Sequence, residues 1–240
     1  MRIAIFGDIH ANLEALQEVL HDAAANEVTD YVCTGDVVGY NADPVGCLQV
    51  VRDMGCPVVK GNHDEDAAGT QALETMNPVA AFALEWTRQQ LNDEERQWLR
   101  RLRMVRQVAE FSVVHSTLDQ PANWNYVTNR FDAMSNFSYQ FTQICFHGHT
   151  HVPKVYAKSD RVHEMAPALV KIEPGTKYFI NVGSVGQPRD GDWRACYVIY
   201  DLERQEVEFR RVEYDLETTQ KKILEAGLPA TLAERLADGR

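Results

Sequence analysis

The sequence has few cysteines, and none of them is paired at a metal-binding spacing. Its 240 residues contain five cysteines, an odd number, and no C-x-x-C pair. This usage argues against a disulfide framework and against a structural zinc site built from thiolates. Cys33 and Cys145 lie within apolar runs, where cysteine packs as a small hydrophobic residue. The cysteines therefore predict a reduced protein in the cytoplasm.

Long apolar runs and an excess of basic residues are also missing. No stretch approaches the roughly 20 apolar residues that span a bilayer, so we expect no membrane association. Met1 leads directly into a short apolar run without the features of a signal peptide. The net charge of −11 argues against a broad nucleic-acid-binding surface. Phosphate chemistry is still allowed, because local metal cations can outweigh a negative overall charge.

Hydrophobic periodicity predicts a parallel α/β half followed by a β-rich half. Strands are expected at 2–7, 30–36 and 57–62, with helices at 12–27 and 43–55 between them. This β-α-β-α-β order implies parallel strands with right-handed crossovers. Strand patterns then return at 105–116, at 143–148 and over most of 152–213.

Helical patterns lie between and after these two halves. Residues 64–103 are expected to be helical, with Asn92 and Glu95 forming a capping box. The C-terminal stretch, about 215–238, predicts two short helices that are broken at Gly227–Pro229. Since no repeat or linker interrupts the chain, we expect one domain over residues 1–240.

Small polar clusters follow the expected strands. Their members are Asp8, His10, Asp36, Asn62, His63, Asp64, His115, His147, His149 and His151. A single Asp after a strand is usually a turn former, and a lone His is usually structural. Five successive strand ends each carry such residues, however, and the carboxyl ends of strands are where sites lie in open α/β sheets. The clusters are therefore expected to converge on a metal site.

The types of ligand narrow the choice of metal. Carboxylate, amide oxygen and imidazole suit Mn²⁺, Fe, Zn²⁺ or Co²⁺, and no cysteine lies in any cluster. About seven ligands are too many for one ion and suit two, and a carboxylate that bridges two ions is the usual arrangement for hydrolysing phosphate esters.

The order of these motifs resembles that of the calcineurin-like metallophosphoesterases. The resemblance is carried by Asp8-x-His10, Gly35-Asp36, Gly61-Asn62-His63-Asp64, His115 and Gly148-His149-Thr150-His151. Residues 35–44 and 181–192 resemble the small bacterial branch of YfcE-like and diadenosine tetraphosphatase-like phosphodiesterases. The resemblance covers about residues 1–200 and implies a four-layer α/β/β/α sandwich of two mixed sheets.

The resemblance also implies a role for most of the polar residues. One metal would be held by Asp8, His10, Asp36 and His151. The second would be held by Asp36, Asn62, His115 and His149, so that Asp36 bridges the two ions. His63 would contact the scissile phosphate or protonate the leaving group, and Asp64 would orient His63. His147 has no metal in this assignment, and its alternatives are a packed histidine at a strand end or a contact to a ligand or substrate.

Together these features predict a dinuclear metal-dependent phosphoesterase. It would hydrolyse a small phosphodiester or nucleotide (pyro)phosphate by in-line attack of a hydroxide that bridges the two ions. Mn²⁺ is the first choice of metal, with Fe, Zn²⁺, Co²⁺ or Ni²⁺ as alternatives. A protein phosphatase and a non-catalytic metal-binding scaffold of the same fold are the alternative functions. The oligomeric state is left open by the sequence.

Further side chains are candidates for contacts to the phosphorylated substrate. Arg189 can bind a phosphate with two donors, or it can form a surface ion pair with Asp190 or Asp192. Tyr40 follows Asp36 closely and can line the mouth of the site. The aromatic stretch 121–131, with Trp124, Tyr126 and Phe131, can stack a nucleobase or pack as a satellite core.

Overall fold

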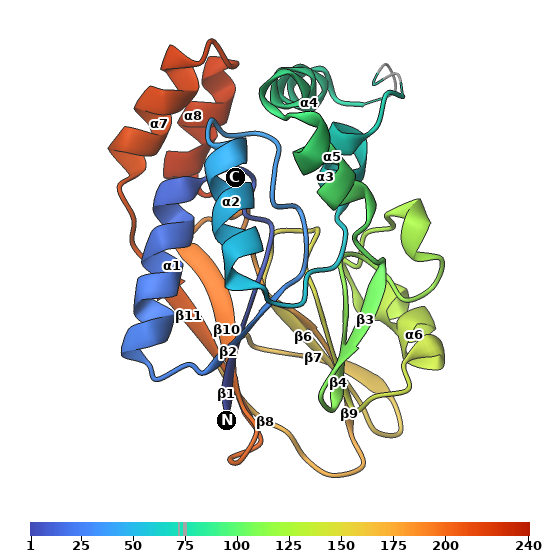
Figure 1. The fold of residues 1–240 in the computed structure, drawn as a ribbon. Coiled ribbons are helices and arrows are strands. Elements are labelled where there is room, and N and C mark those ends of the chain that lie inside the picture. Colours follow the sequence, from blue (N-terminus) through green and yellow to red (C-terminus); the bar gives the residue numbers. More distant parts are fainter. Residues whose placement is uncertain (72, 74–75) are drawn as a thin grey trace.

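Two mixed β-sheets pack face to face in the computed structural model, which describes residues 1–240 except 72, 74 and 75 (Figure 1). The strands of the first sheet are β1 (Arg2–Phe6), β2 (Asp30–Cys33), β8 (Leu169–Lys171), β10 (Ala195–Asp201) and β11 (Glu206–Val212). The strands of the second are β3 (Val105–Val108), β4 (Phe111–Val114), β5 (Ile144–His147), β6 (Lys154–Lys158), β7 (Val162–Met165) and β9 (Lys177–Asn181).

Both sheets combine parallel and antiparallel pairs. The first sheet has the order β2-β1-β10-β11-β8, in which β1 is parallel to β2 and antiparallel to β10. The second has the order β3-β4-β5-β9-β6-β7, in which β5 is parallel to both β4 and β9. Parallel neighbours bring their carboxyl ends to one edge, so the loops after β1, β2, β4 and β5 can meet there.

Alternate side chains of β1 pack on opposite faces of the first sheet. Ile3 and Ile5 face the core between the sheets, where they join residues of the second sheet such as Phe146. Ala4 and Phe6 point to the other side, under the helix α1 (Leu13–Ala25). A strand that is buried on both faces has a continuous apolar sequence, and residues 3–6 of β1 have this pattern.

Helices cover the outer face of each sheet. α1 and α2 (Pro44–Met54) pack on the first sheet, and α6 (Arg130–Tyr139) packs on the second through Ala133 and Phe137. α2 begins with Pro44 and ends at Gly55, whose φ of 60° is left-handed, in the positions where proline and glycine favour a helix start and stop. The predicted four-layer α/β/β/α sandwich is confirmed.

The expected third strand at 57–62 is reduced to two isolated bridges. Val58 pairs with Cys33 in a parallel bridge, and Val59 pairs with Arg103. The chain already enters the helix α3 (Asn62–Ala68) at Asn62, so too few extended residues remain for a longer ladder.

Three helices cover most of the stretch 64–103 that the sequence predicts to be helical, but the described residues between the first two are not helical. α4 (Pro78–Gln90) and α5 (Asp93–Arg100) follow α3, whereas residues 72, 74 and 75 of the expected helical stretch lie outside the described residues. The capping box of α5 is confirmed: the Glu95 N–H donates to Asn92 Oδ1 at 3.0 Å, and the Asn92 N–H donates to Glu95 Oε2 at 2.7 Å.

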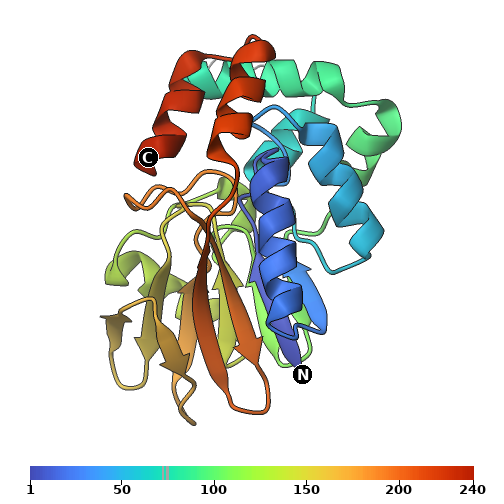
Figure 2. The same ribbon diagram turned by 90° about the vertical axis from the view of Figure 1, so that its left-hand side faces the viewer.

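Two C-terminal helices, α7 (Leu216–Glu225) and α8 (Ala230–Asp238), occupy the predicted 215–238 segment. Leu232 and Leu236 of α8 form an apolar cluster with Ala83 of α4, and Tyr40 packs against that cluster. Figure 2 shows the two helices beside α4, above the strands and next to the loop that follows β9. They therefore stand over the edge at which the strand-end loops meet.

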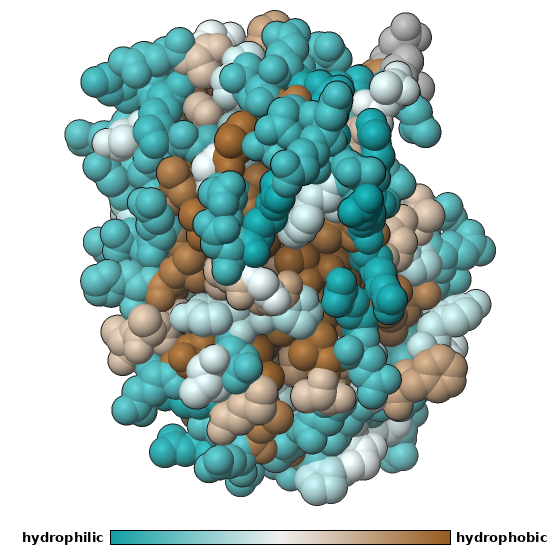
Figure 3. Space-filling view, viewed as in Figure 1, coloured by the Kyte–Doolittle hydropathy of each residue, from teal (hydrophilic) through white to brown (hydrophobic). Residues whose placement is uncertain are grey.

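The face seen in Figure 1 is mostly hydrophilic at its rim, and hydrophobic residues gather toward its middle (Figure 3). Among the described residues, no helix combines the length and the apolar character needed to cross a bilayer.

We expect Asn92→Ala to lower the free energy of unfolding by about 1 kcal/mol, because the Glu95 N–H loses its acceptor. Urea denaturation followed by circular dichroism measures this change. Gln97→Ala, at an exposed position of the same helix, is the control and is expected to stay within about 0.5 kcal/mol of the parent protein. Equal stabilities of the two variants would contradict the capping role.

Candidate metal centre

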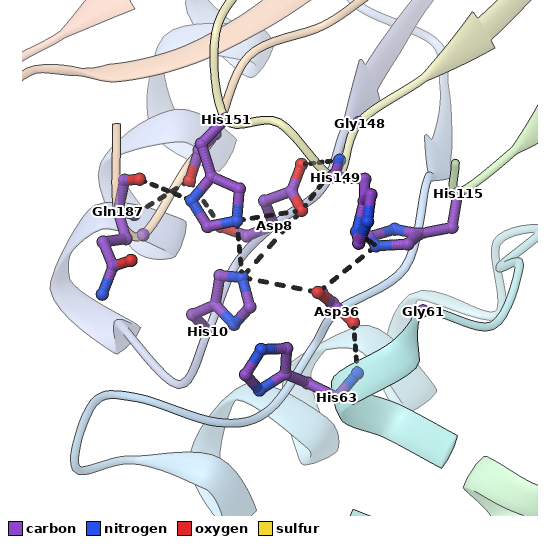
Figure 4. Close-up of polar contacts among 12 residues, drawn as sticks. Asp8, His10, Asp36, Gly61, His63, His115, Gly148, His149, His151 and Gln187 are labelled. Atoms are coloured by element: carbon purple, nitrogen blue, oxygen red, sulfur yellow. Dashed lines mark hydrogen bonds and ion pairs between the residues drawn. The ribbon is translucent and has the colours of Figure 1, made fainter. Parts of the chain in front are cut away.

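Polar side chains from five segments converge at the carboxyl edge of the sheets (Figure 4). Asp8 and His10 follow β1, Asp36 follows β2, His115 follows β4, and the 147–151 segment ends and follows β5. Asn62 and His63 begin α3. The convergence predicted from the sequence is therefore present, and its members are nearly all buried.

The first ligand group contains Asp8, His10, Asp36 and His151. One potential ligand atom from each lies within 4.8 Å of all the others. His10 Nε2 is 3.0 Å from His151 Nε2 and 3.5 Å from Asp36 Oδ2. His151 Nε2 is 3.4 Å from Asp8 Oδ1. The potential ligand atoms of the four residues are therefore close enough together to bind one cation.

The second ligand group contains Asp36, His115 and His149, with Asn62 beside it. His115 Nε2 is 3.3 Å from Asp36 Oδ2, 3.1 Å from His149 Nδ1 and 3.2 Å from Asn62 Oδ1. Figure 4 shows Asp36 between His10 on one side and His115 on the other. Asp36 therefore belongs to both groups.

Backbone carbonyls set the protonation of the four converging histidines. Each ring donates the hydrogen of one nitrogen to a carbonyl: His10 Nδ1 to Val38, His115 Nδ1 to Thr34, His151 Nδ1 to Gln187 and His149 Nε2 to Trp124, over 2.6–3.1 Å. In a neutral imidazole the other nitrogen then carries a lone pair, and in all four rings that nitrogen faces the cluster. Four lone pairs and two carboxylates directed at one another fit cations, so the residues present suit divalent metals.

Burial and charge shift the pKa values of the ligand histidines in different directions. Burial lowers the pKa of His149 to about 3 and that of His151 well below its usual value, which leaves both rings free to ligate. Burial also opposes protonation of His115, but the charges of Asp36 and Asp8, together with the hydrogen bonds to Asp36 and to the Thr34 carbonyl, outweigh burial and raise the pKa of His115 to about 9. A divalent cation beside Asp36 would compete with that proton.

Most of the candidate ligands have a strained backbone. Asp8, His10, Asp36, His149 and His151 have φ values of 46°, 47°, 52°, 72° and 60°, in the left-handed region that favours glycine. Such conformations cost on the order of 1–3 kcal/mol each and persist where the surrounding structure enforces them. Backbone donors supply part of that enforcement. The His149 N–H donates to Asp8 Oδ2 at 3.0 Å, and the His63 N–H donates to Asp36 Oδ1 at 2.9 Å.

Asp64 has a different role from the one predicted. Its carboxylate accepts backbone N–H groups of Asp36, Val37 and Gly61 at 2.9, 2.8 and 3.1 Å, and no hydrogen bond within the described residues joins it to the ring of His63. As the third residue of α3, Asp64 reaches back to the N-terminal end of its own helix and to the turn after β2. It therefore positions the turn that carries Asp36 rather than orienting His63.

His63 lies beside both ligand groups without joining either. Its ring centroid is 4.8 Å from that of His10 and 4.5 Å from that of Tyr40. Its Nδ1 is buried against Gly39 and has no hydrogen-bond partner among the described residues. Burial lowers the pKa of His63 to about 4, although the charge of Asp36 acts in the opposite direction. The ring is therefore neutral at pH 7.

Arg189 lies beside Tyr40, donates to Gln187 Oε1, and forms no ion pair with Asp190 or Asp192. Its guanidinium is 5.5 Å from the ring centroid of Tyr40, and its backbone N–H donates to the His151 carbonyl at 3.2 Å. The neighbouring carboxylates have other partners, since Asp190 pairs with Arg211 and Asp192 with Arg194.

His147 is a packed residue at the end of β5, as one of its two predicted alternatives requires. It is 1% exposed, and its ring stacks on Phe179 with centroids 4.1 Å apart. Its Nδ1 is 3.4 Å from Asn181 Nδ2, whose hydrogens also bind the Gly148 carbonyl at 2.6 Å. His147 thus lies in neither ligand group and contacts the side chain that supports the following turn.

Two of the three aromatic residues named in the stretch 121–131 contact the site. Tyr126 stacks on His149, with ring centroids 4.2 Å apart, and remains 56% exposed. Trp124 supplies the carbonyl that orients His149, whereas Phe131 lies on α6 and is 65% exposed. Backbone carbonyls such as that of Trp124 carry no signal in the sequence, because every residue has one.

Comparisons with known proteins agree with this geometry. The model of the calcineurin-like phosphoesterase superfamily domain matches residues 1–205. An uncharacterized protein of Methanocaldococcus jannaschii is 36% identical over 244 residues, which cover 99% of this chain and 98% of that protein.

Solved structures extend the similarity to the whole chain. A metallophosphoesterase from Sphaerobacter thermophilus has a TM-score of 0.89 and 42% identity, covering 100% of this chain and 99% of its own. A hypothetical protein from Pyrococcus horikoshii OT3 shares the fold, with a TM-score of 0.84, 17% identity and coverage of 100% and 98%. Both matches include the C-terminal helices, which lie beyond the range of the family model.

Gly61→Ala should weaken metal binding about tenfold or more, the size seen when residues that support ligands are changed. The added Cβ would lie 2.0 Å from Asp36 Oδ1, whereas the φ of −95° at Gly61 allows any residue. Equilibrium dialysis against Mn²⁺ with elemental analysis gives the metal content. Gly69→Ala is the control, because its nearest contact would be 3.2 Å from the Glu65 carbonyl oxygen. Equal metal contents in the two variants would refute the steric explanation.

Proposed function

This chain belongs to the calcineurin-like phosphoesterase superfamily, and from that premise we propose that it is a dinuclear metal-dependent phosphoesterase. Its substrate would be a small phosphodiester or a nucleotide (pyro)phosphate. The observation that carries the proposal is the shared position of Asp36. Its Oδ2 is 3.5 Å from His10 Nε2 and 3.3 Å from His115 Nε2, so one oxygen lies between the two ligand groups.

The proposed ligands divide between two ions. The first ion would be held by Asp8, His10, Asp36 and His151, and the second by Asp36, Asn62, His115 and His149. Oxygen and imidazole donors without thiolate make Mn²⁺ the first candidate, with Fe, Zn²⁺, Co²⁺ and Ni²⁺ as alternatives. When bound, two such ions supply Lewis acidity, which makes water nucleophilic near neutral pH and offsets charge on phosphoryl oxygens.

His63 is the proposed proton donor to the leaving oxygen. It is held next to the shared carboxylate by the hydrogen bond from its own N–H to Asp36 Oδ1, while its ring packs against those of His10 and Tyr40. Burial favours the neutral ring, but the negative charge of a bound phosphate ester favours the protonated one. Transfer of that proton to the leaving oxygen would return the ring to its neutral form.

Two side chains beside the ligand groups suit the rest of a nucleotide-like substrate. Arg189 presents a guanidinium toward Tyr40 and the metal centre, where it can bind phosphoryl oxygens. Tyr126 stacks on His149 and remains half exposed, so its outer side is available to a flat ring. We also propose a cytoplasmic location, because all five cysteines are free.

A substrate screen with the Mn²⁺-supplemented protein tests the proposed function. It compares bis-p-nitrophenyl phosphate, p-nitrophenyl phosphate, cyclic nucleotides, dinucleoside polyphosphates and a phosphopeptide. We expect turnover of at least one diester or pyrophosphate, and we expect Asp36→Asn to lose affinity for both metals together with activity. Turnover confined to the phosphopeptide would favour a protein phosphatase. An absence of turnover with both metals bound would favour a scaffold.

His63→Ala is expected to retain both metals but to lose about 10²–10⁴-fold in kcat, the usual range for one acid–base group. The loss should be larger for an aryl ester with a poor leaving group than for the p-nitrophenyl ester, because only the former depends strongly on protonation. Metal content and kcat for the two esters are the measurements. Loss of both metals, or equal losses on the two esters, would reject the proposed role.

A further inference from the structure

The segment that follows β9 lies against the ligands of the first group. We refer to residues 184–187 as the β9 loop. The loop is buried, with Ser184 and Gln187 both 0% exposed. A Cβ at Gly186 would overlap the Ile9 carbonyl oxygen, so the backbone of the loop contacts the segment that joins Asp8 to His10. In Figure 4, Gln187 lies beyond His151, on the side of the cluster away from His115.

The Ser184 hydroxyl connects two ligands that are far apart in the sequence. Ser184 Oγ donates to the Asp8 carbonyl at 2.8 Å and accepts the Gln187 N–H at 2.9 Å. The Gln187 carbonyl in turn accepts from His151 Nδ1 at 2.6 Å. A chain of three hydrogen bonds therefore runs from Asp8 to His151, and Ser184 supplies its only side-chain link.

Asn41 connects the same loop to a third ligand. Its Nδ2 donates to the His10 carbonyl at 2.7 Å and to the Gly186 carbonyl at 3.3 Å. Asn41 is 0% exposed, so water does not compete for these hydrogen bonds. The Gly186 N–H also donates to the Asp8 carbonyl at 2.9 Å. The β9 loop is therefore tied to Asp8, His10 and His151, which are the three ligands that belong only to the first group.

The three ligands that belong only to the second group are supported by other parts of the chain. The Thr34 carbonyl accepts from His115 Nδ1 at 2.9 Å, and the Trp124 carbonyl accepts from His149 Nε2 at 2.8 Å. Asn62 begins α3. Within the part of the chain that the structure describes, no hydrogen bond joins the β9 loop to any of these three ligands.

Separate supports have a consequence for two bound ions. The groups that orient a ligand typically contribute 10- to 100-fold to metal affinity, because a ligand that can turn away binds less tightly. A change in the β9 loop would loosen Asp8, His10 and His151 together. The ligands of the second ion, apart from the shared Asp36, would keep their own hydrogen bonds.

We propose that Ser184 and Asn41 are positioning residues that set the affinity of the first ion separately from that of the second. Neither side chain is a ligand, and each acts through the backbone of the ligand segments. This inference rests on the proposed dinuclear site and adds that the two ions are controlled by different loops of the chain.

The test follows the binding of Zn²⁺ to the full-length protein labelled with ¹⁵N-histidine. The ring nitrogens of His10 and His151 report on the first ion, and those of His115 and His149 report on the second. A titration followed by nuclear magnetic resonance therefore gives a dissociation constant for each ion. Equilibrium dialysis with elemental analysis counts the ions bound at each concentration of free Zn²⁺.

Ser184→Ala is expected to weaken the first ion about tenfold or more and to leave the affinity of the second unchanged. Asn41→Ala should have the same selective effect by a separate route, through the His10 carbonyl. Ser116→Ala is the matched control, because Ser116 is 1% exposed, follows His115 of the second group and donates only to the Pro121 carbonyl, at 3.5 Å. It should change neither affinity. Circular dichroism checks that each variant is folded.

The outcomes separate this inference from the function on which it rests. Equal weakening of both ions, or an unchanged first ion, in the folded Ser184→Ala or Asn41→Ala variant would overturn the positioning role even if the enzyme is active. Selective weakening of the first ion would support that role even if every substrate in the screen failed, and in that case the proposed hydrolysis would be wrong. A parent protein that binds Zn²⁺ only at His115 and His149 would overturn both.

Discussion

Two carboxylates and four imidazole lone pairs share one buried volume, and the structure around that volume depends on holding them there. Such groups repel one another at 3–4 Å unless a cation lies between them. The chain keeps them in place with its backbone: carbonyls fix the tautomer of each ring, and N–H groups bind the carboxylates. The cost of this arrangement appears in the left-handed φ values of Asp8, His10 and Asp36. Strain of this kind is typical of preorganised sites.

The same crowding explains why the metal motifs contain glycine. A Cβ at Gly61 would lie 2.0 Å from Asp36 Oδ1, and one at Gly148 would lie 2.3 Å from Asp8 Oδ2. The backbone of one motif therefore contacts the carboxylate of another. Asp64 acts in this framework as well, since it binds the N–H groups of the turn after β2 and so holds the position of Asp36. Glycine and Asp64 thus stabilise the ligands without binding metal themselves.

Positive charge near the centre comes from two sources in an otherwise acidic chain. Divalent cations would neutralise the ligand groups, and Arg189 lies beside them because its backbone is tied to the His151 carbonyl. Helix α8 is attached to the same loop through Gly239 and to Tyr40 through its apolar side. The C-terminal helices therefore pack on α4 and contact the loop and the tyrosine that lie beside the metal centre.

Local patterns in the sequence determined the elements and the chemistry of the site, and the tertiary structure decided which residues meet. Hydrophobic period predicted the parallel α/β half and the β-rich half, and residue types predicted the capping box at Asn92 and the ligand types, because these depend on residues a few positions apart. The four-layer sandwich was implied by the resemblance of the motifs. The resemblance of the motifs separated His147 from His149 and His151 but left its role open, and only packing places His147 against Phe179. The sequence also misassigned Asp64 and overextended the strand at 57–62. The Trp124 carbonyl that orients His149 had no local signal at all. Its position is set by contacts between segments far apart in the chain, and such contacts leave no periodic trace in the sequence.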